Sequence, residues 1–86
     1  MERRHEPVFG GFREMAQRRR ALAADLVNVR LAKGLSQTEV AARMGTSQSA
    51  VARLESGDAD VRLSTLERYA MAVGFELRWQ LGKGSR

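Results

Sequence analysis

Cysteine is absent from this chain, and histidine and proline each occur once. Without cysteine the chain can form neither a disulfide nor a thiolate metal site, and this absence favours a reducing compartment. The single histidine, His5, stands alone near the N-terminus, so neither a Ser-His pair nor a metal site of usual spacing can be assembled around it. We therefore expect no enzyme activity, no metal and no cofactor.

Long hydrophobic runs are also missing. No apolar stretch approaches the roughly 18 residues that a membrane-spanning helix needs, and the N-terminus lacks the apolar segment of a signal peptide. The segment Gly82-Lys83-Gly84-Ser85 lacks the upstream glycine and the strand-loop-helix setting of a phosphate-binding loop. The lack of a membrane-spanning stretch and of a signal peptide favours a cytoplasmic protein with no membrane partner.

Basic residues outnumber acidic ones by 15 to 10, which gives a formal net charge of +5. Such a surface attracts polyanions, nucleic acid before an anionic membrane. The basic excess lies in the first third of the chain, at Arg3, Arg4, Arg13, Arg18, Arg19 and Arg20. A solvated helix face and contact with phosphates explain the run Arg18–Arg20 equally well.

The first third of the chain divides into an arm and a helix. Residues 1–11 contain the single Pro, the single His and a Gly-Gly pair, so we expect a flexible N-terminal arm. A helical pattern runs from Phe12 to Lys33 and ends at Gly34. Its apolar stripe consists of Leu22, Leu26 and Val29.

A second, short helix is predicted directly afterwards. Ser36 and Glu39 have the spacing of a capping box, in which each side chain accepts a hydrogen bond from the backbone amide of the other residue. Gly45 ends this helix after about two turns. Val40, Ala41 and Met44 are expected to face the core.

Two further helices follow. Ser47 is the expected N-cap of a helix over Gln48–Ser56, which Gly57 ends and whose core residues are Val51 and Leu54. The stretch Ser64–Glu67 has the form of another capping box and opens a fourth helix. Its core residues are Leu66, Ala70 and Val73, and Gly74 follows its end.

The last part of the chain has a period of two residues, which is typical of a strand. The alternating apolar residues are Phe75, Leu77, Trp79 and Leu81. No second strand pattern exists in the chain, so we expect this strand to pair with its copy in a homodimer. A fifth helix is the alternative for the segment, and base stacking is the alternative role for Trp79.

The predicted fold class is therefore all-α, a bundle of four to five helices with a C-terminal β-strand paired across a dimer. The predicted segments are a flexible arm over 1–11, a helical domain over 12–74, a dimerisation strand over 75–81 and a disordered tail over 82–86.

The second and third helices, with Gly45-Thr46-Ser47 between them, have the spacing of a helix-turn-helix. The stretches "KGLSQTEVAARMGTSQSAVARLESG" and "LSTLERYAMAVG" resemble the DNA-binding domain shared by phage repressors, Cro-like proteins and xenobiotic-response-element regulators. The resemblance covers Leu26 to Val73, a little over half the chain, and implies a repressor-like bundle that binds DNA. The alternative is a structural helical hairpin that binds nothing.

By this resemblance the third helix is the recognition helix, and its outward residues contact base edges in a major groove. Gln48 has an amide that suits adenine, because it donates and accepts together. Arg53 suits guanine or a phosphate, and Ser49 is a smaller base-contacting residue beside them.

Phosphate contacts are expected at the helix starts, where backbone amides carry partial positive charge. Gln37 takes the backbone-contacting role that a Gln at this place has in the family. The other candidates for phosphate contact are Thr46, Ser47, Arg43 and Arg62. The resemblance also implies a structural ion pair between Arg30 and Glu55. Removing either residue would leave the charge of the other without a partner.

One recognition helix contacts few base pairs, so we expect a homodimer on a palindromic operator and a repressor associated with the nucleoid. The small size and "RLSTLERYAMAVGFELRWQL" also resemble antitoxins of the HigA kind, which repress their operon and bind a toxin. Candidate toxin contacts are then Val8, Phe9, Phe12 and the first helix. A stand-alone repressor and a chromatin protein that ignores sequence are the alternatives, and the N-terminal arm enters a minor groove, holds a partner or stays free.

Overall fold

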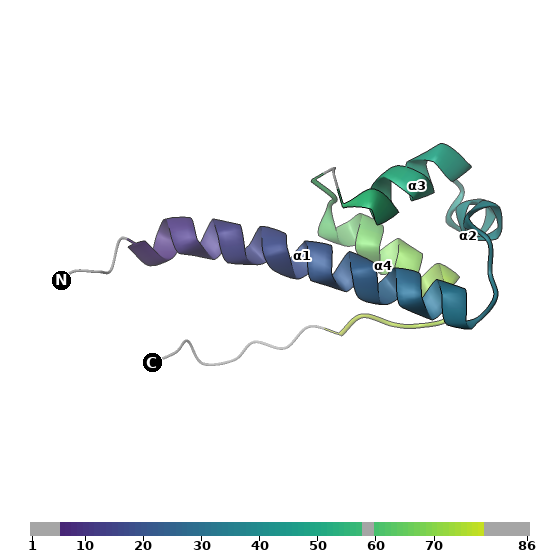
Figure 1. Cartoon of the computed structure of the whole chain (residues 1–86), viewed down its shortest axis with the longest axis horizontal. Coiled ribbons are helices and arrows are strands. Elements are labelled where there is room, and N and C mark those ends of the chain that lie inside the picture. The colour runs from purple at the N-terminus through teal and green to yellow at the C-terminus, as the bar shows by residue number, and fades with distance from the viewer. Residues whose placement is uncertain (1–5, 58–59, 79–86) are drawn as a thin grey trace.

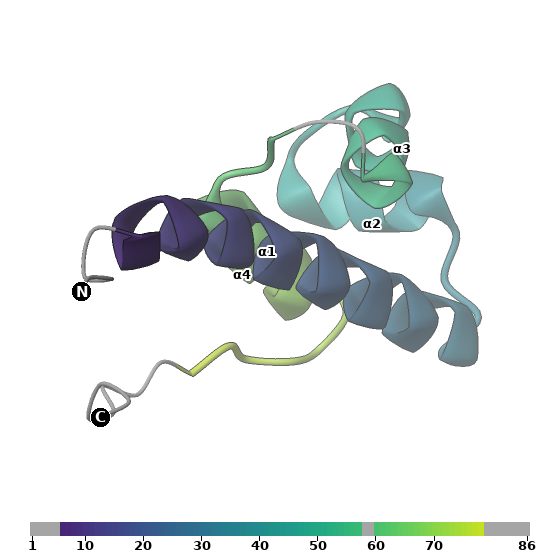
Figure 2. The same ribbon diagram turned by 60° about the vertical axis from the view of Figure 1, so that its left-hand side comes forward.

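The computed structural model describes the backbone of residues 6–57 and 60–78 and the side chains of residues 14–57 and 60–78. These residues form four helices, as expected for an all-α bundle. The helices are α1 (Glu6–Ala32), α2 (Gln37–Met44), α3 (Gln48–Ser56) and α4 (Leu63–Ala72). α4 lies against α1, and α2 and α3 pack together on one side of that pair (Figures 1 and 2). The N-terminal part of α1 projects beyond the other three helices (Figure 1).

One hydrophobic core joins all four helices. Its largest fully buried side chains are Leu66, Tyr69, Val40, Val51 and Val73. The predicted inward faces of α2, α3 and α4 are confirmed, while Leu22 and Val29 of α1 are only partly buried against this core. Among the described residues, no helix is both long enough and apolar enough to cross a bilayer.

The boundaries of α2 and α3 agree with the sequence. The Ser36 hydroxyl accepts from the Glu39 amide at 3.0 Å, and the Glu39 carboxylate accepts from the Ser36 amide at 2.7 Å. Ser47 caps α3 by accepting from the Ala50 amide at 3.1 Å. Gly45 adopts a left-handed conformation with φ of 72°, which glycine reaches without the steric cost that a Cβ adds. The predicted turn between the two helices is therefore present.

The start of α1 differs from the prediction, because the helix begins at Glu6 rather than at Phe12. The expected arm is wrong for residues 6–11, while residues 1–5 lie outside the described part. Pro7 falls in the first turn, where its missing N–H has no helical partner to lose. Gly10 and Gly11 lie within the helix. A glycine inside a helix lowers its stability by about 1 kcal/mol relative to alanine, but it does not have to end the helix.

The predicted capping box at the start of α4 is wrong. The helix begins at Leu63, and its N-cap residue is Arg62, which makes no side-chain capping bond. The carbonyl of Arg62 already accepts from the amides of Thr65 and Leu66. Ser64 is therefore inside the first turn rather than at the capping position.

The C-terminal segment does not form the predicted strand in its described part. Residues 75–78 have no regular secondary structure, helix or strand, and they run back along α1 (Figures 1 and 2). A strand needs a hydrogen-bonded neighbour, and no other strand exists among the described residues. Leu77 packs against the core of its own chain, and Phe75 is about half exposed beneath the Lys33 ammonium. Trp79, Leu81 and the predicted tail over 82–86 lie outside the described residues.

Candidate nucleic-acid interface

α2 and α3 are held at a fixed angle by apolar residues on their facing sides. Val40, Ala41 and Met44 of α2 and Val51 and Leu54 of α3 are all buried. The turn between them is closed by a hydrogen bond of 2.9 Å from the Thr46 amide to the Ala41 carbonyl. Because one side of α3 is committed to the core, its opposite side faces solvent.

That solvent-facing side of α3 carries the three predicted base-contacting residues. Gln48, Ser49 and Arg53 are exposed. The hydroxyls of Ser47 and Ser49 lie 3.2 Å apart. The Arg53 guanidinium donates no hydrogen bond to a described residue. The geometry thus presents an amide, a hydroxyl and a guanidinium together on one face, which matches the donor and acceptor types that base edges require.

The predicted phosphate-contacting residues differ in their exposure and in their partners within the chain. Thr46, Ser47 and Arg62 are exposed near the starts of α3 and α4. Gln37 is half-buried at the start of α2, where its amide donates to Glu55 and accepts from Gln48. Its side chain therefore joins α2 to both ends of α3.

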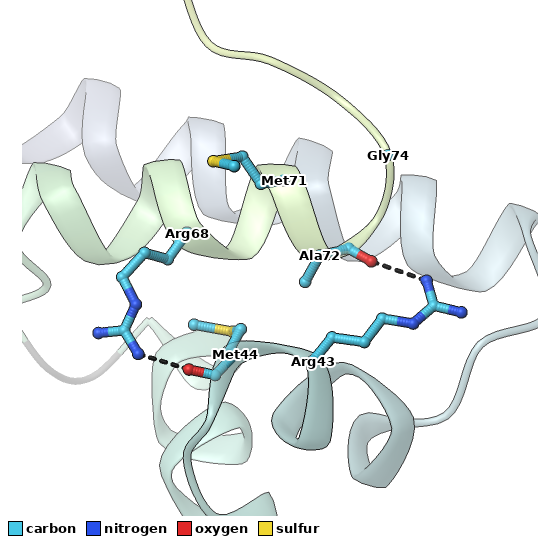
Figure 3. Close-up of a pocket in the computed structure, with 6 residues that line it drawn as sticks. All are labelled: Arg43, Met44, Arg68, Met71, Ala72 and Gly74. Carbon is cyan, nitrogen blue, oxygen red and sulfur yellow. Dashed lines mark hydrogen bonds between the residues drawn. The ribbon is translucent and has the colours of Figure 1, made fainter.

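Arg43 has a partner within the chain that the sequence did not indicate. Its guanidinium donates to the carbonyl of Ala72, at the end of α4, at 2.8 Å. Arg68 of α4 makes the reciprocal contact and donates to the carbonyl of Met44, at the end of α2. Figure 3 shows these two arginines at opposite ends of a pocket of about 390 Å³. Each therefore neutralises the negative end of the other's helix.

Arg30 and Glu55 form the expected ion pair, with two parallel hydrogen bonds of 2.7 and 2.9 Å. Their side chains are only 10% and 8% exposed. Arg30 also donates to the carbonyl of Leu35 at 2.8 Å. The sequence did not reveal a further partner, Tyr69, whose hydroxyl donates to the same carboxylate.

Hydrogen bonds among Arg30, Glu55, Tyr69 and Gln37 set the protonation states of these side chains. Burial alone would raise the pKa of the Glu55 carboxyl, but the bonds from Arg30, Tyr69 and Gln37 together outweigh it and hold that pKa below its usual value. The bond to Glu55 raises the pKa of Arg30 despite burial. Burial, followed by the bond to Glu55, raises the pKa of the Tyr69 phenol. Glu55 is therefore an anion and Tyr69 a neutral donor at neutral pH.

A second ion pair joins two regions that no sequence pattern connects. Arg19 of α1 donates to the Asp60 carboxylate at 3.1 Å and so ties α1 to the segment before α4. The two residues are 41 positions apart, so no local sequence pattern predicts the contact. It gives one member of the run Arg18–Arg20 a structural partner.

The paired helices, their glycine turn and the polar outer face of α3 define a helix-turn-helix protein. The helix-turn-helix family model HTH_3 matches residues 26–80, and this chain belongs to that family. The chain is similar to Antitoxin HigA1 of Mycobacterium tuberculosis (strain H37Rv), with 44% identity over 73 residues, which are 85% of this chain and 49% of the relative. It is also similar to Putative antitoxin HigA3 of the same strain, with 48% identity over 59 residues, 66% of this chain and 54% of the relative.

The chain thus spans about half the length of the curated relatives that it matches. No solved structure matches it significantly. The predicted toxin-contacting residues Val8, Phe9 and Phe12 belong to α1, but their side chains lie outside the described part.

Proposed function

We propose that this chain is a sequence-specific DNA-binding transcriptional regulator whose α3 enters the major groove. The observation that carries the proposal is the exposed set Gln48, Ser49 and Arg53 on a helix whose other face is locked into the core. In this role Gln48 contacts adenine, Arg53 contacts guanine or a phosphate, and Ser49 contacts a neighbouring base edge.

Contacts to the DNA backbone fix the position of α3 on the duplex. Gln37, Thr46 and Ser47 are proposed to contact phosphates from the starts of α2 and α3, where helix dipoles favour anions. Arg62 adds a positive charge from the start of α4. Arg43 contributes only the guanidinium donors that its bond to Ala72 leaves over.

The regulator is proposed to act as a homodimer that represses transcription from a palindromic operator. A single recognition helix contacts few base pairs, and two-fold symmetry places two copies about 34 Å apart or at a multiple of that distance. The proposed dimer interface consists of Phe75, Trp79 and Leu81, whereas Leu77 packs against the core of its own chain. Of these, Phe75 has a half-exposed ring that a second copy could cover.

The chain is further proposed to be an antitoxin in the cytoplasm, at the nucleoid, that represses its own operon. The names of its relatives support this step, since both are called antitoxins. The proposed toxin-binding surface is the part of α1 around Val8, Phe9 and Phe12. Figure 1 shows that this part of the helix projects past the bundle.

Selection of bound duplexes from a random pool tests the DNA-binding proposal. We expect the wild-type chain to enrich two inverted half-sites, and Gln48→Ala and Arg53→Ala each to lose the preference at one position of the half-site. Arg78→Ala is the matched control, because Arg78 is exposed on the tail, with its side chain 83% accessible, and away from α3. Enrichment of no common sequence would overturn the proposal.

Co-purification with the product of the neighbouring reading frame tests the antitoxin step. We expect a stable complex that Phe9→Asp disrupts and Gln48→Ala leaves intact, since only the first residue belongs to the proposed toxin-binding surface. Retention of the complex in Phe9→Asp would remove that surface from the proposal. Absence of any complex with the wild-type chain would favour a stand-alone repressor.

A further inference from the structure

Tyr69 has a feature that core packing does not explain. It lies on α4, its side chain is fully buried, and its hydroxyl is directed at the Glu55 carboxylate at the end of α3. A phenylalanine would fill nearly the same volume without bringing a polar atom into the core. The hydroxyl therefore serves the carboxylate rather than the packing.

The Glu55 carboxylate receives four hydrogen bonds. Oε2 accepts from Arg30 Nε and from the Tyr69 hydroxyl, while Oε1 accepts from Arg30 and from Gln37 Nε2 at 2.9 Å each. An ionised carboxylate accepts hydrogen bonds and donates none. Gln37 must therefore turn its NH₂ group toward Glu55.

This constraint extends to the surface of α3. Because the Gln37 NH₂ group faces Glu55, its carbonyl oxygen faces Gln48 and accepts from Gln48 Nε2. A side-chain amide can otherwise rotate to exchange its nitrogen and oxygen. Here the charge of Glu55 fixes the order of donor and acceptor in both amides, as far as the exposed end of Gln48.

We propose that Glu55 and Tyr69 are positioning residues for base recognition, acting through Gln37 to hold the Gln48 amide in one orientation. The proposal rests on the function proposed above. In that orientation Gln48 keeps a free carbonyl oxygen and one remaining N–H, the pair that adenine N6 and N7 require. Rotation of the amide would exchange the two and lose both contacts.

Tyr69 is the informative member, because it cannot contact the DNA itself. Removing its hydroxyl leaves the carboxylate with three hydrogen bonds, two from Arg30 and one from Gln37, and takes away the bond that holds Oε2 from the side of α4. The carboxylate can then shift relative to Gln37. Any change in base preference must then pass through Glu55 and Gln37. A role confined to stability would instead weaken binding to all sequences alike.

The test measures relative affinities at one salt concentration for four duplexes that differ only at the base pair whose preference Gln48→Ala removes. We expect Tyr69→Phe to lower the preference for adenine at this pair by about threefold to tenfold, a part of what one bidentate contact provides. In further duplexes that vary the other base pairs one at a time, we expect Tyr69→Phe to change no preference. In the Gln48→Ala background Tyr69→Phe should have no further effect on base preference, because Tyr69 acts only through Gln48.

Val73→Ala is the control for stability, since Val73 is buried one helical turn after Tyr69 and its side chain makes none of the hydrogen bonds that lead from Tyr69 to Gln48. It should lower the free energy of unfolding and leave base preference unchanged. A uniform loss of affinity in Tyr69→Phe, or the same change of preference with and without Gln48, would overturn the proposal. If the wild-type chain prefers no sequence at all, the proposed function fails, and the positioning role fails with it.

Discussion

At the scale of single residues, the Arg30–Glu55 pair has the largest expected effect on folding. Both side chains are about nine-tenths buried, and each is bonded to the other twice. Removing one partner of such a pair leaves an uncompensated buried charge. The exposed pair Arg78–Glu76, at 3.4 Å, has no such consequence, because water solvates both charges.

Glu55→Ala should therefore lower the free energy of unfolding by about 3–5 kcal/mol. In a small domain this is a large part of the total stability. Glu76→Ala should change it by less than about 0.5 kcal/mol. Urea denaturation followed by circular dichroism measures both values, and equal effects of the two substitutions would contradict the role given to the buried pair.

Two carboxyl groups link folding to pH. The amide and hydroxyl of Ser36 lower the pKa of Glu39. Despite burial, the hydrogen bonds from Arg30, Tyr69 and Gln37 lower the pKa of Glu55. A lowered pKa in the folded state means that the unfolded chain binds protons first as the pH falls, so stability decreases on acidification. This contribution is present above the ordinary glutamate pKa of 4.5 and is lost below it.

The free energy of unfolding should accordingly be nearly constant at neutral pH and fall as the pH drops below 4.5. Glu39→Gln should show a shallower decline, because one of the two contributions is gone. The measurement is a series of urea denaturation curves across that pH range. Identical slopes for the wild type and Glu39→Gln would show that Glu39 is not linked to folding.

At the scale of helices, the residues at each start decide where it begins. Ser36 caps α2 through the Glu39 amide, whereas Ser64 stands inside the first turn of α4. Ser36→Ala should cost about 1 kcal/mol, the usual value for a lost N-cap, and Ser64→Ala should cost a few tenths at most. Thermal denaturation of both variants tests this difference, and a larger loss in Ser64→Ala would restore the capping box.

The same comparison shows how far the sequence alone predicts this fold. The paired helices and their turn follow from signals within a few residues, such as Ser36 with Glu39 and the left-handed Gly45. The start of α1 was misplaced because Pro7 is compatible with a first turn as well as with an arm. A local sequence pattern predicts a helix boundary only where its residues are incompatible with the alternative structure.

Contacts between distant residues were harder to predict. Tyr69 meets Glu55 across 14 positions, Gln37 meets it across 18, and Arg43 meets Ala72 across 29. No periodicity relates such residues, and only the packed bundle brings them together. The ion pair of Arg30 and Glu55 was foreseen through family resemblance alone, and the alternation of residues 75–81 could not decide between strand and coil without a partner.

At the scale of the whole molecule, the proposed phosphate contacts of this chain, whose net charge is +5, predict that DNA binding weakens with salt, because each contact releases counterions. A residue that contacts one phosphate contributes about one unit to the slope of log affinity against log salt concentration. Arg62→Ala should therefore reduce the slope by about 1 and weaken binding to all sequences alike. Gln48→Ala should leave the slope unchanged, and an unchanged slope in Arg62→Ala would remove Arg62 from the interface.

The central claim is that the exposed face of α3 recognises DNA sequence. Fluorescence anisotropy at one near-physiological salt concentration measures the ratio of affinities for a selected duplex and for its scrambled counterpart. The wild-type ratio should be on the order of 1,000 or more, and Arg53→Ala should reduce it by about tenfold. Equal affinity of the wild-type chain for both duplexes, unaffected by Arg53→Ala, would contradict the claim.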